Sequence, residues 1–147
     1  MKSLSLTLGV ILIGLLIFRY AEVWGEDWVR YGKRKIGSYY YNQQSVTRQS
    51  EDIVRAWNKI VFTKKGVEKI VERLGKSYEN AGYDISLKEI NCTDKTQRSI
   101  SSNIYSRKGE LLSTPPYNIE WEPITQGTLS DILLQKVCNS MGKEINP

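Results

Sequence analysis

Residues 87–98 read LKEINCTDKTQR, a strand-like run that ends on Cys92 and is followed by a polar turn. The only other cysteine of the 147-residue chain is Cys138, and the chain contains no histidine. Cys92 is therefore a reactive thiol, a metal ligand or half of a disulfide. The choice depends on the compartment in which the protein folds, because disulfides persist only under oxidising conditions.

The N-terminus predicts export. Lys2 precedes an apolar run over residues 4–18, which is shorter than the roughly 20 residues of a membrane-spanning helix and typical of a secretory signal peptide. Small residues at Val23 and Gly25 favour cleavage after Gly25. We therefore expect residues 1–25 to be a signal peptide.

An uncleaved N-terminal anchor is the alternative, because Trp24 is bulky for a cleavage site and Arg19 follows the apolar run. In either case, residues 26–147 are long enough for one domain with a single hydrophobic core. The formal net charge of the whole chain is +5, a mildly basic balance that favours anionic surfaces without indicating nucleic acid.

The export signal bears directly on the two cysteines. Two cysteines in an oxidising compartment normally pair, two sulfurs without histidine make a poor zinc site, and no imidazole is present to activate a free thiol. We predict a Cys92–Cys138 disulfide, with Ile90 on the same face of the strand as Cys92. We expect no metal and no cofactor.

Hydrophobic patterning predicts a mostly antiparallel sheet. Alternating, aromatic or β-branched runs indicate strands at residues 27–31, 36–41, 53–62, 85–92, 98–106 and 110–113. The run 53–62 is apolar on both of its sides, so we expect a central strand that is covered on both faces. A last short extended piece is expected near NIEWEPI, residues 118–124.

Two helices complete the predicted fold. An apolar stripe at helical spacing runs from Val67 to Ala81, and Gly82 stands where a C-cap is expected. Thr128-Leu-Ser-Asp131 is similar to a capping box and begins a short C-terminal helix. The expected class is α+β: a mostly antiparallel sheet of about five to six strands, one internal amphipathic helix, and a C-terminal helix tied to the sheet by the disulfide.

Basic and aromatic neighbours are the candidate ligand-binding residues: Lys33, Arg34, Lys35, Tyr39 and Tyr41. On a strand, Tyr39 and Tyr41 share one face. Aromatic rings interleaved with cations bind polyanions or single-stranded nucleic acid, but export removes access to nucleic acid. Tyrosine also fills pleated surfaces in sheet proteins, so the alternative is that these rings are structural.

The absence of histidine argues against an enzyme, because the usual general base near neutral pH and the Ser-His-Asp and Cys-His arrangements are missing. Glu120 and Glu122 would share one strand face and could imitate a carboxylate pair. We interpret them instead as solvated acids that flank a buried Trp121. A cryptic enzyme that uses Glu120 or Glu122 is the least favoured hypothesis.

Several segments follow one another in an order that a known family shares. They are an early Trp strand, a tyrosine-rich strand before QQSV, VRAWNK, YDISLKEINCTDKTQRSISSNIYSRKGELL and WEPITQGTLSDILLQKVC. In this order and spacing, residues 27–140 resemble the surface-adhesin protein E family of bacterial exported and surface proteins. The resemblance implies an antiparallel sheet with a disulfide-pinned C-terminal helix, and adhesion to host matrix and serum proteins without catalysis.

The leading hypothesis is therefore an exported, non-enzymatic binding protein in the periplasm or at the cell surface of a bacterium. Its expected ligand is a protein or a polyanion. No nucleic-acid partner is expected, and a membrane partner is expected only if residues 1–25 are retained. The alternative is a membrane-tethered structural or assembly factor of the cell envelope.

Overall fold

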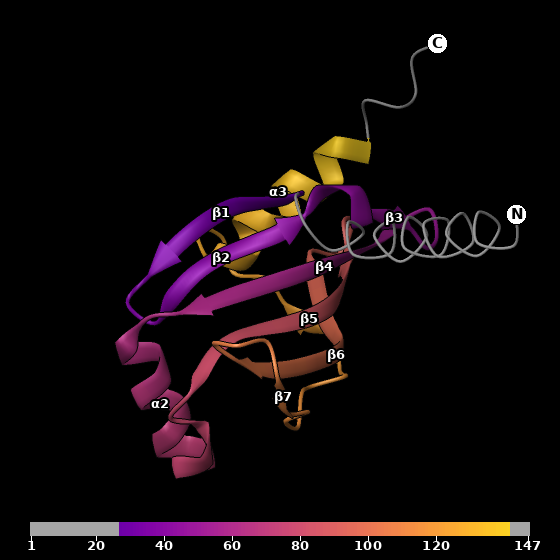
Figure 1. Ribbon diagram of the computed structural model, residues 1–147. Helices are drawn as coiled ribbons and strands as arrows, with labels where there is room; N and C mark the ends of the chain where they lie inside the picture. The colour runs from indigo at the N-terminus through magenta and orange to yellow at the C-terminus, as the bar shows by residue number, and fades with distance from the viewer. Residues whose placement is uncertain (1–26, 142–147) are drawn as a thin grey trace, which may run out of the picture.

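The computed structural model describes residues 27–141, so the predicted signal peptide at residues 1–25 lies outside the described residues. An antiparallel sheet occupies the centre (Figure 1). Its strands in the described part are β1 (Trp28–Arg34), β2 (Gly37–Asn42), β3 (Thr47–Arg48), β4 (Ile53–Phe62), β5 (Ala81–Asn91), β6 (Thr96–Ser106), β7 (Leu111–Ser113) and β8 (Glu122–Pro123).

Six of these strands form the main path of the sheet, in the order β1-β2-β4-β5-β6-β7, while β3 pairs with β4 and β8 pairs with β6. Every pairing is antiparallel. The predicted sheet is therefore confirmed. The central strand β4 has the predicted bounds, 53–62. Its β-branched and aromatic residues favour a strand, and the surrounding sheet favours the same structure.

Two helices cover one face of the sheet. Helix α2 (Lys64–Leu74) begins at Thr63, whose hydroxyl accepts a hydrogen bond from the Gly66 amide. Helix α3 (Leu129–Met141) begins after Thr128, whose hydroxyl accepts from the Asp131 amide, while the Asp131 carboxylate accepts from the Gly127 amide. The capping-box prediction is thus confirmed in a slightly extended form.

The core consists of two apolar clusters on this helix-covered face. Beneath α3 lie the buried residues Tyr41, Val54, Ala56, Ile90, Leu133, Leu134 and Val137. Beneath α2 lie Ile70, Ala81 and Ile104, with Phe62, Leu74, Tyr78 and Leu112 packed against them. Each helix therefore covers its own cluster.

The internal helix ends earlier than predicted. It ends at Leu74, and Gly75 is its C-cap, with φ 105°. Residues with a side chain disfavour this conformation. Beyond it, Tyr78 lies in a 3-10 turn and Ala81 begins β5. The apolar stripe continued past the helix in the sequence because these two residues pack into the same cluster as Ile70.

The prediction that residues 53–62 are covered on both faces was wrong. Val54, Ala56 and Asn58 are buried on the helix side, whereas Trp57 and Lys59 on the opposite side are only partly buried. Their side chains lie on what we call the open face of the sheet, which neither α2 nor α3 covers. The strand is apolar on both sides because large side chains on the open face cover one another and so reduce their contact with water.

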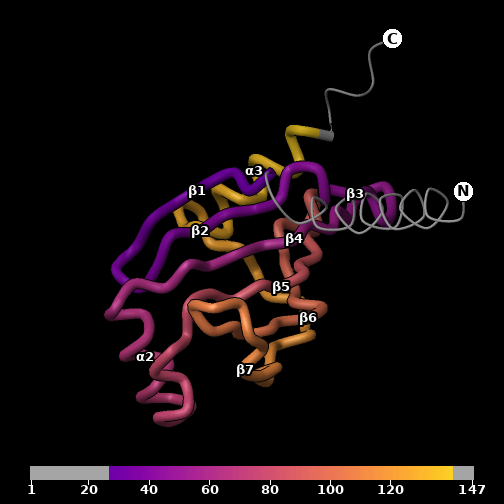
Figure 2. Tube along the Cα trace, viewed as in Figure 1, coloured from indigo at the N-terminus to yellow at the C-terminus, as the bar shows by residue number. Residues whose placement is uncertain are grey.

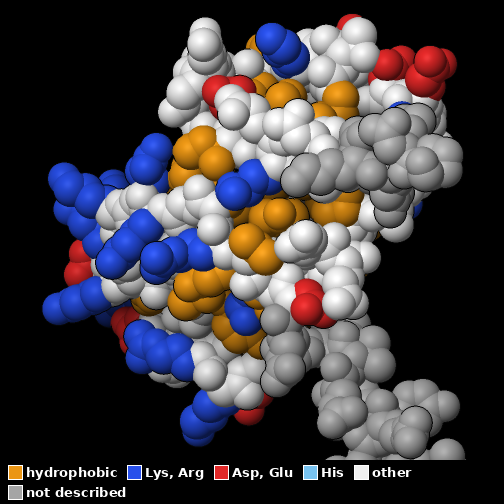
Figure 3. Space-filling view, turned by 90° about the horizontal axis from the view of Figure 1, so that it is seen from above, with side chains coloured by type: hydrophobic (Ala, Val, Ile, Leu, Met, Phe, Trp, Pro, Cys, Tyr) orange, Lys and Arg blue, Asp and Glu red, His pale blue; other side chains and the backbone are white. Residues whose placement is uncertain are grey.

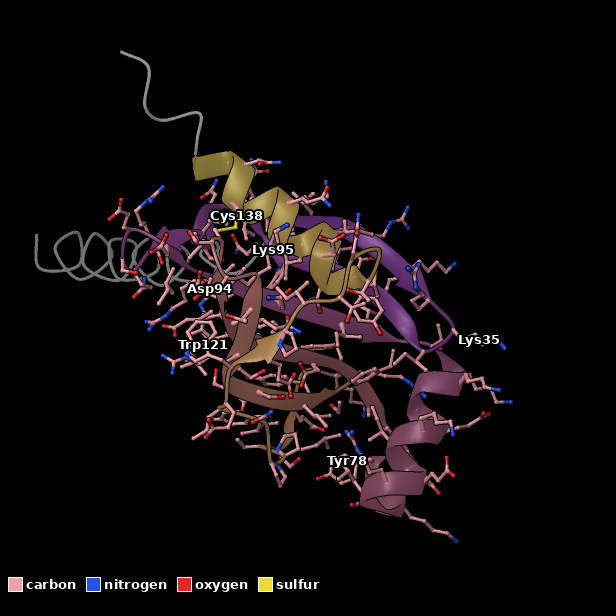
Figure 4. The ribbon with its side chains drawn as sticks, turned by 180° about the vertical axis from the view of Figure 1, so that it is seen from behind. Lys35, Tyr78, Asp94, Lys95, Trp121 and Cys138 are labelled. Carbon is pink, nitrogen blue, oxygen red and sulfur yellow. A yellow bond between two sulfur atoms is a disulfide. The ribbon has the colours of Figure 1, made fainter. Side chains whose placement is uncertain are left out.

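The predicted disulfide is confirmed. Cys92 and Cys138 are bonded with their Cα atoms 5.9 Å apart, and the bond ties α3 to the end of β5 (Figure 4). Ile90 is 1% exposed and shares the α3 cluster with both cysteines, as predicted. In the described part of the chain, no helix combines the length and apolarity needed to cross a membrane.

Replacing both cysteines by serine should destabilise the domain. The bond closes a loop with a sequence separation of 46, and the chain-entropy model gives about 4 kcal/mol for a loop of this size. Urea unfolding followed by circular dichroism measures the loss. Wild-type protein under reducing conditions is the control and should match the double variant; equal stability of oxidised wild type and double variant would contradict this role.

Candidate functional site: a basic end beside the open face

The turn between β1 and β2 carries three cations at one end of the molecule. Arg34 pairs with Gly37 across the hairpin, which leaves Lys33, Arg34 and Lys35 exposed at its tip. The guanidinium of Arg34 donates a hydrogen bond to the backbone carbonyl of Lys33. The predicted basic segment is therefore on the surface.

The start of α2 lies beside this tip (Figure 2). The Thr63 hydroxyl donates to the Lys35 carbonyl at 2.6 Å, and the Thr63 amide donates to the Ile36 carbonyl at 3.0 Å. Gly66 allows the contact, because a Cβ at this position would collide with the Ile36 carbonyl oxygen. The first helical turn is thereby held against the hairpin.

This contact adds two cations to the tip, Lys64 and Lys65, which are both exposed. We define the basic end as Lys33, Arg34, Lys35, Lys64 and Lys65. Figure 3 shows Lys and Arg side chains gathered at the left of the molecule, the end at which Figure 1 places the β1–β2 turn and α2. Sequence reasoning missed the lysines of α2, because only the fold brings them to the hairpin.

The electrostatics of the basic end are unfavourable in isolation. Among the described residues, none of its five cations takes part in an ion pair. Lys64 and Lys65 lie in the first turn of α2, and this first turn contains no acidic residue. Cations there oppose the positive end of the helix dipole, at a cost of about 0.3–1 kcal/mol each when exposed. An anionic ligand would relieve this repulsion.

Tyr39 and Tyr41 share one strand face as predicted, but this face points toward the core. Tyr41 is 5% exposed and belongs to the α3 cluster, so it is a core residue and not a surface ligand contact. Tyr39 is half-buried, with its ring centroid 6.2 Å from that of Tyr31. Burial raises the pKa of Tyr39, and Arg34 partly opposes that shift.

The open face holds an aromatic row that the sequence analysis did not identify. The Lys59 ammonium lies 4.7 Å from the ring centroid of Tyr83 and 5.6 Å from that of Trp28. The rings of Tyr83 and Tyr105 stack with centroids 5.2 Å apart. These contacts come from strands β1, β4, β5 and β6, and they shield the part of the sheet that neither α2 nor α3 covers.

A second cluster on the open face centres on Glu89, which is 3% exposed. Its carboxylate accepts hydrogen bonds from Arg55 Nε at 3.1 Å and Arg98 Nε at 2.8 Å. Burial alone would raise the pKa of Glu89, but the hydrogen bonds from Arg55 and Arg98 outweigh it and hold this pKa below its usual range. Arg98 in turn lies 4.6 Å from the ring centroid of Trp121.

The interpretation of Trp121 as buried was wrong, because its ring covers the Arg98 guanidinium from the outside and is 37% exposed. Glu120 and Glu122 beside it are both exposed. Glu122 accepts a hydrogen bond from the Asn118 amide, and neither acid lines the cavity of about 710 Å³ that lies beside α2. Among the described residues, no group of three acids or cysteines is arranged to hold a metal ion.

Replacing Glu89 by glutamine should lower the free energy of unfolding by about 2 kcal/mol at pH 7, the typical size for a buried hydrogen bond between charged groups. Because the folded-state pKa is depressed, this stabilisation is present above the unfolded carboxyl pKa of about 4.3 and is lost as pH falls through the folded value. The gap between wild type and Glu89→Gln should therefore narrow in acid.

Urea unfolding between about pH 3 and about pH 7 measures this gap, because these two pH values lie on either side of the carboxyl pKa of about 4. Glu68→Gln is the matched control, because Glu68 is exposed on α2 and its loss should change stability by less than about 0.5 kcal/mol. A pH-independent gap for Glu89→Gln would show that its carboxylate is not the stabilising group.

Comparison with known proteins assigns the chain to a family. The family model described as surface-adhesin protein E matches residues 28–139. Crystal form II of Haemophilus influenzae protein E superposes with a TM-score of 0.60 at 20% identity, over 80% of this chain and 91% of that chain. Another structure of Haemophilus influenzae protein E gives a TM-score of 0.58 at 18% identity, over 83% and 91% of the two chains.

Protein E from non-typeable Haemophilus influenzae gives a TM-score of 0.57 at 18% identity, over 81% of this chain and 80% of that chain. At these identities, the structural likeness establishes the fold. No curated protein matches the chain. The match to the family model spans both cysteines and every strand and most of α3 of the described structure. The chain therefore belongs to the surface-adhesin protein E family.

Proposed function

We propose that this protein is an exported, non-enzymatic binding protein of adhesin type, whose basic end holds a protein or polyanionic ligand in the periplasm or at the cell surface. The observation that carries this proposal is the basic end itself. Five exposed cations from two elements gather at one tip, and among the described residues none has an ion-pair partner.

The placement of Lys64 and Lys65 supports a ligand more strongly than the hairpin cations alone. A solvated surface is expected to place acids in the first turn of a helix, because acids there are stabilised by the dipole. Helix α2 has lysines there instead. The residues therefore cost stability in the free protein and gain interactions when an anion is bound.

Apolar surface beside the cations favours a protein ligand over a purely ionic one. Ile36 is 40% exposed within the tip, and Val61 is 38% exposed on β4, opposite Ser38 of the hairpin. Exposed apolar side chains beside polar ones are typical of protein interfaces. The family description as a surface adhesin agrees with such a role. The scattered, exposed acids of the 118–122 segment support a non-enzymatic protein.

Removing the hairpin cations should weaken binding to an anionic probe. Heparin is a suitable first probe because it is a polyanion of uniform charge. The triple variant Lys33→Ala, Arg34→Ala, Lys35→Ala should bind heparin at least about tenfold more weakly, and the salt slope of the binding constant should fall by about one for each cation that contacts the ligand. Lys64→Ala with Lys65→Ala should act in the same direction.

The matched control is Lys76→Ala, Arg107→Ala, Lys108→Ala, which removes the same charge from exposed positions outside the basic end. Isothermal titration over a range of salt concentrations measures each affinity. If the control weakens binding as much as the hairpin variant, net charge and not the basic end governs binding. Capture of an acidic protein by wild type, but not by the hairpin variant, would favour the protein ligand.

A further inference from the structure

A cavity of about 710 Å³ opens on the helix-covered face, and none of the five cations of the basic end lines it. Strands β4, β5 and β6 form its floor, α2 forms one side, and Pro115 and Pro116 form another. Figure 4 views the molecule from this side, with Tyr78 at the far end of α2 and Lys35 at its start. The cavity adjoins the α2 cluster, whose Phe62, Ile70 and Ile104 are part of its lining.

The cavity lining combines apolar side chains with polar and charged ones. Ile60 and Phe62 contribute from β4, Ile70 from α2 and Ile104 from β6. Ile70 and Ile104 are themselves core residues, at 7% and 2% exposure. The volume is in the range of small-molecule sites, which are mainly apolar and contain a few convergent polar groups.

Lys88 brings a positive charge to the floor of this cavity. Its side chain is half-buried, and its ammonium donates one long hydrogen bond, 3.4 Å, to Gln97 Oε1. The Gln97 amide is held in turn by the Ser130 hydroxyl of α3. Among the described residues, Lys88 has no ion-pair partner. Two of its three N–H groups therefore remain available to a ligand.

Asp84, the buried acid nearest to this lysine in the cavity lining, is already satisfied. It is 8% exposed, and its Oδ2 accepts a hydrogen bond from the Ser102 hydroxyl at 2.7 Å. Burial raises the pKa of Asp84, and hydrogen bonds from Ser102 and Ser86 oppose that shift. Burial lowers the pKa of Lys88, and the charges of Asp84 and Glu122 oppose that shift. The lysine is thus the under-bonded member of the two.

The remaining charges of the lining leave an excess of one positive charge. Lys69 and Glu72 pair with each other at 2.9 Å on the outer surface of α2. Within the lining, Arg73 and Lys88 then outnumber the single acid Asp84, and Glu122 acts on Lys88 from outside the lining. Charge complementarity favours a ligand with one negative charge and disfavours a cation.

We propose that the cavity binds a small amphiphilic monoanion, with its carboxylate or sulfonate at Lys88 and its apolar part against Ile60, Phe62 and Ile70. The apolar walls account for the hydrophobic part, and the free N–H groups of Lys88 account for the anionic group. This site goes beyond the proposed function of the basic end, because none of the five cations of the basic end lines the cavity and Ile36 is the one side chain that the two proposals share.

The test uses anilinonaphthalene sulfonate, an apolar monoanion whose fluorescence rises on leaving water. The purified protein should bind one equivalent, and decanoate should displace it, whereas decyltrimethylammonium at the same concentration should not. Lys88→Met should bind the probe at least tenfold more weakly. It should also unfold at a higher temperature than wild type, because it removes a buried charge that has no ion-pair partner among the described residues.

Lys59→Met is the matched control, because it removes the same charge from the open face and should leave probe affinity unchanged. Ser99→Phe tests the cavity by volume: Ser99 lines it, and the larger ring should exclude the probe while near-ultraviolet circular dichroism stays native. Unchanged probe affinity in a folded Lys88→Met protein would overturn the proposal. Equal displacement by the cationic surfactant would overturn it as well.

Discussion

The attachment of α3 to the sheet is the constraint on which the rest of the structure depends. Leu133 and Val137 are fully buried, and the disulfide fixes the last turns of the same helix to the end of β5. The first strand depends on α3 in turn, because Val29 and Tyr31 of β1 pack against the α3 cluster. The hairpin that carries the basic end is therefore positioned by a helix from the other end of the chain.

A polar strip divides the interior into two parts. Asp84, Ser86 and Lys88 alternate along β5 and point to the helix side, between the α2 cluster and the α3 cluster. A continuous apolar strip there would have joined the two clusters into one core of greater stability. Burying an acid and a lysine costs free energy. Because α2 and α3 each cover only their own cluster, a cavity remains over the polar strip. The most direct account of this arrangement is a ligand that uses the buried charge.

Sequence patterns could predict the elements but not every orientation. The bounds of β4 and the cap of α3 followed from local chemistry, since strand composition and capping need no knowledge of the neighbours. The disulfide followed from the predicted export and from the presence of only two cysteines. The cavity could not be found in this way. Along YDISLKEI, Ile85 and Leu87 are the apolar members of the alternation, and the usual assumption places them inward. Both instead lie on the open face, opposite Lys59 and Trp57, so the polar members became the interior ones.

The two proposed sites differ in their exposure to solvent. The cations of the basic end are exposed, so their attraction for an anion reaches only about one Debye length, roughly 8 Å at physiological ionic strength, and weakens as salt is added. The charge of Lys88 is partly shielded from water, so screening is weaker there and a single ionic contact is stronger. A ligand at the basic end is therefore released by salt. A ligand in the cavity is retained by apolar contact, which salting-out conditions strengthen. Ionic strength thus assigns any ligand found for this protein to one site or the other before a single residue is changed.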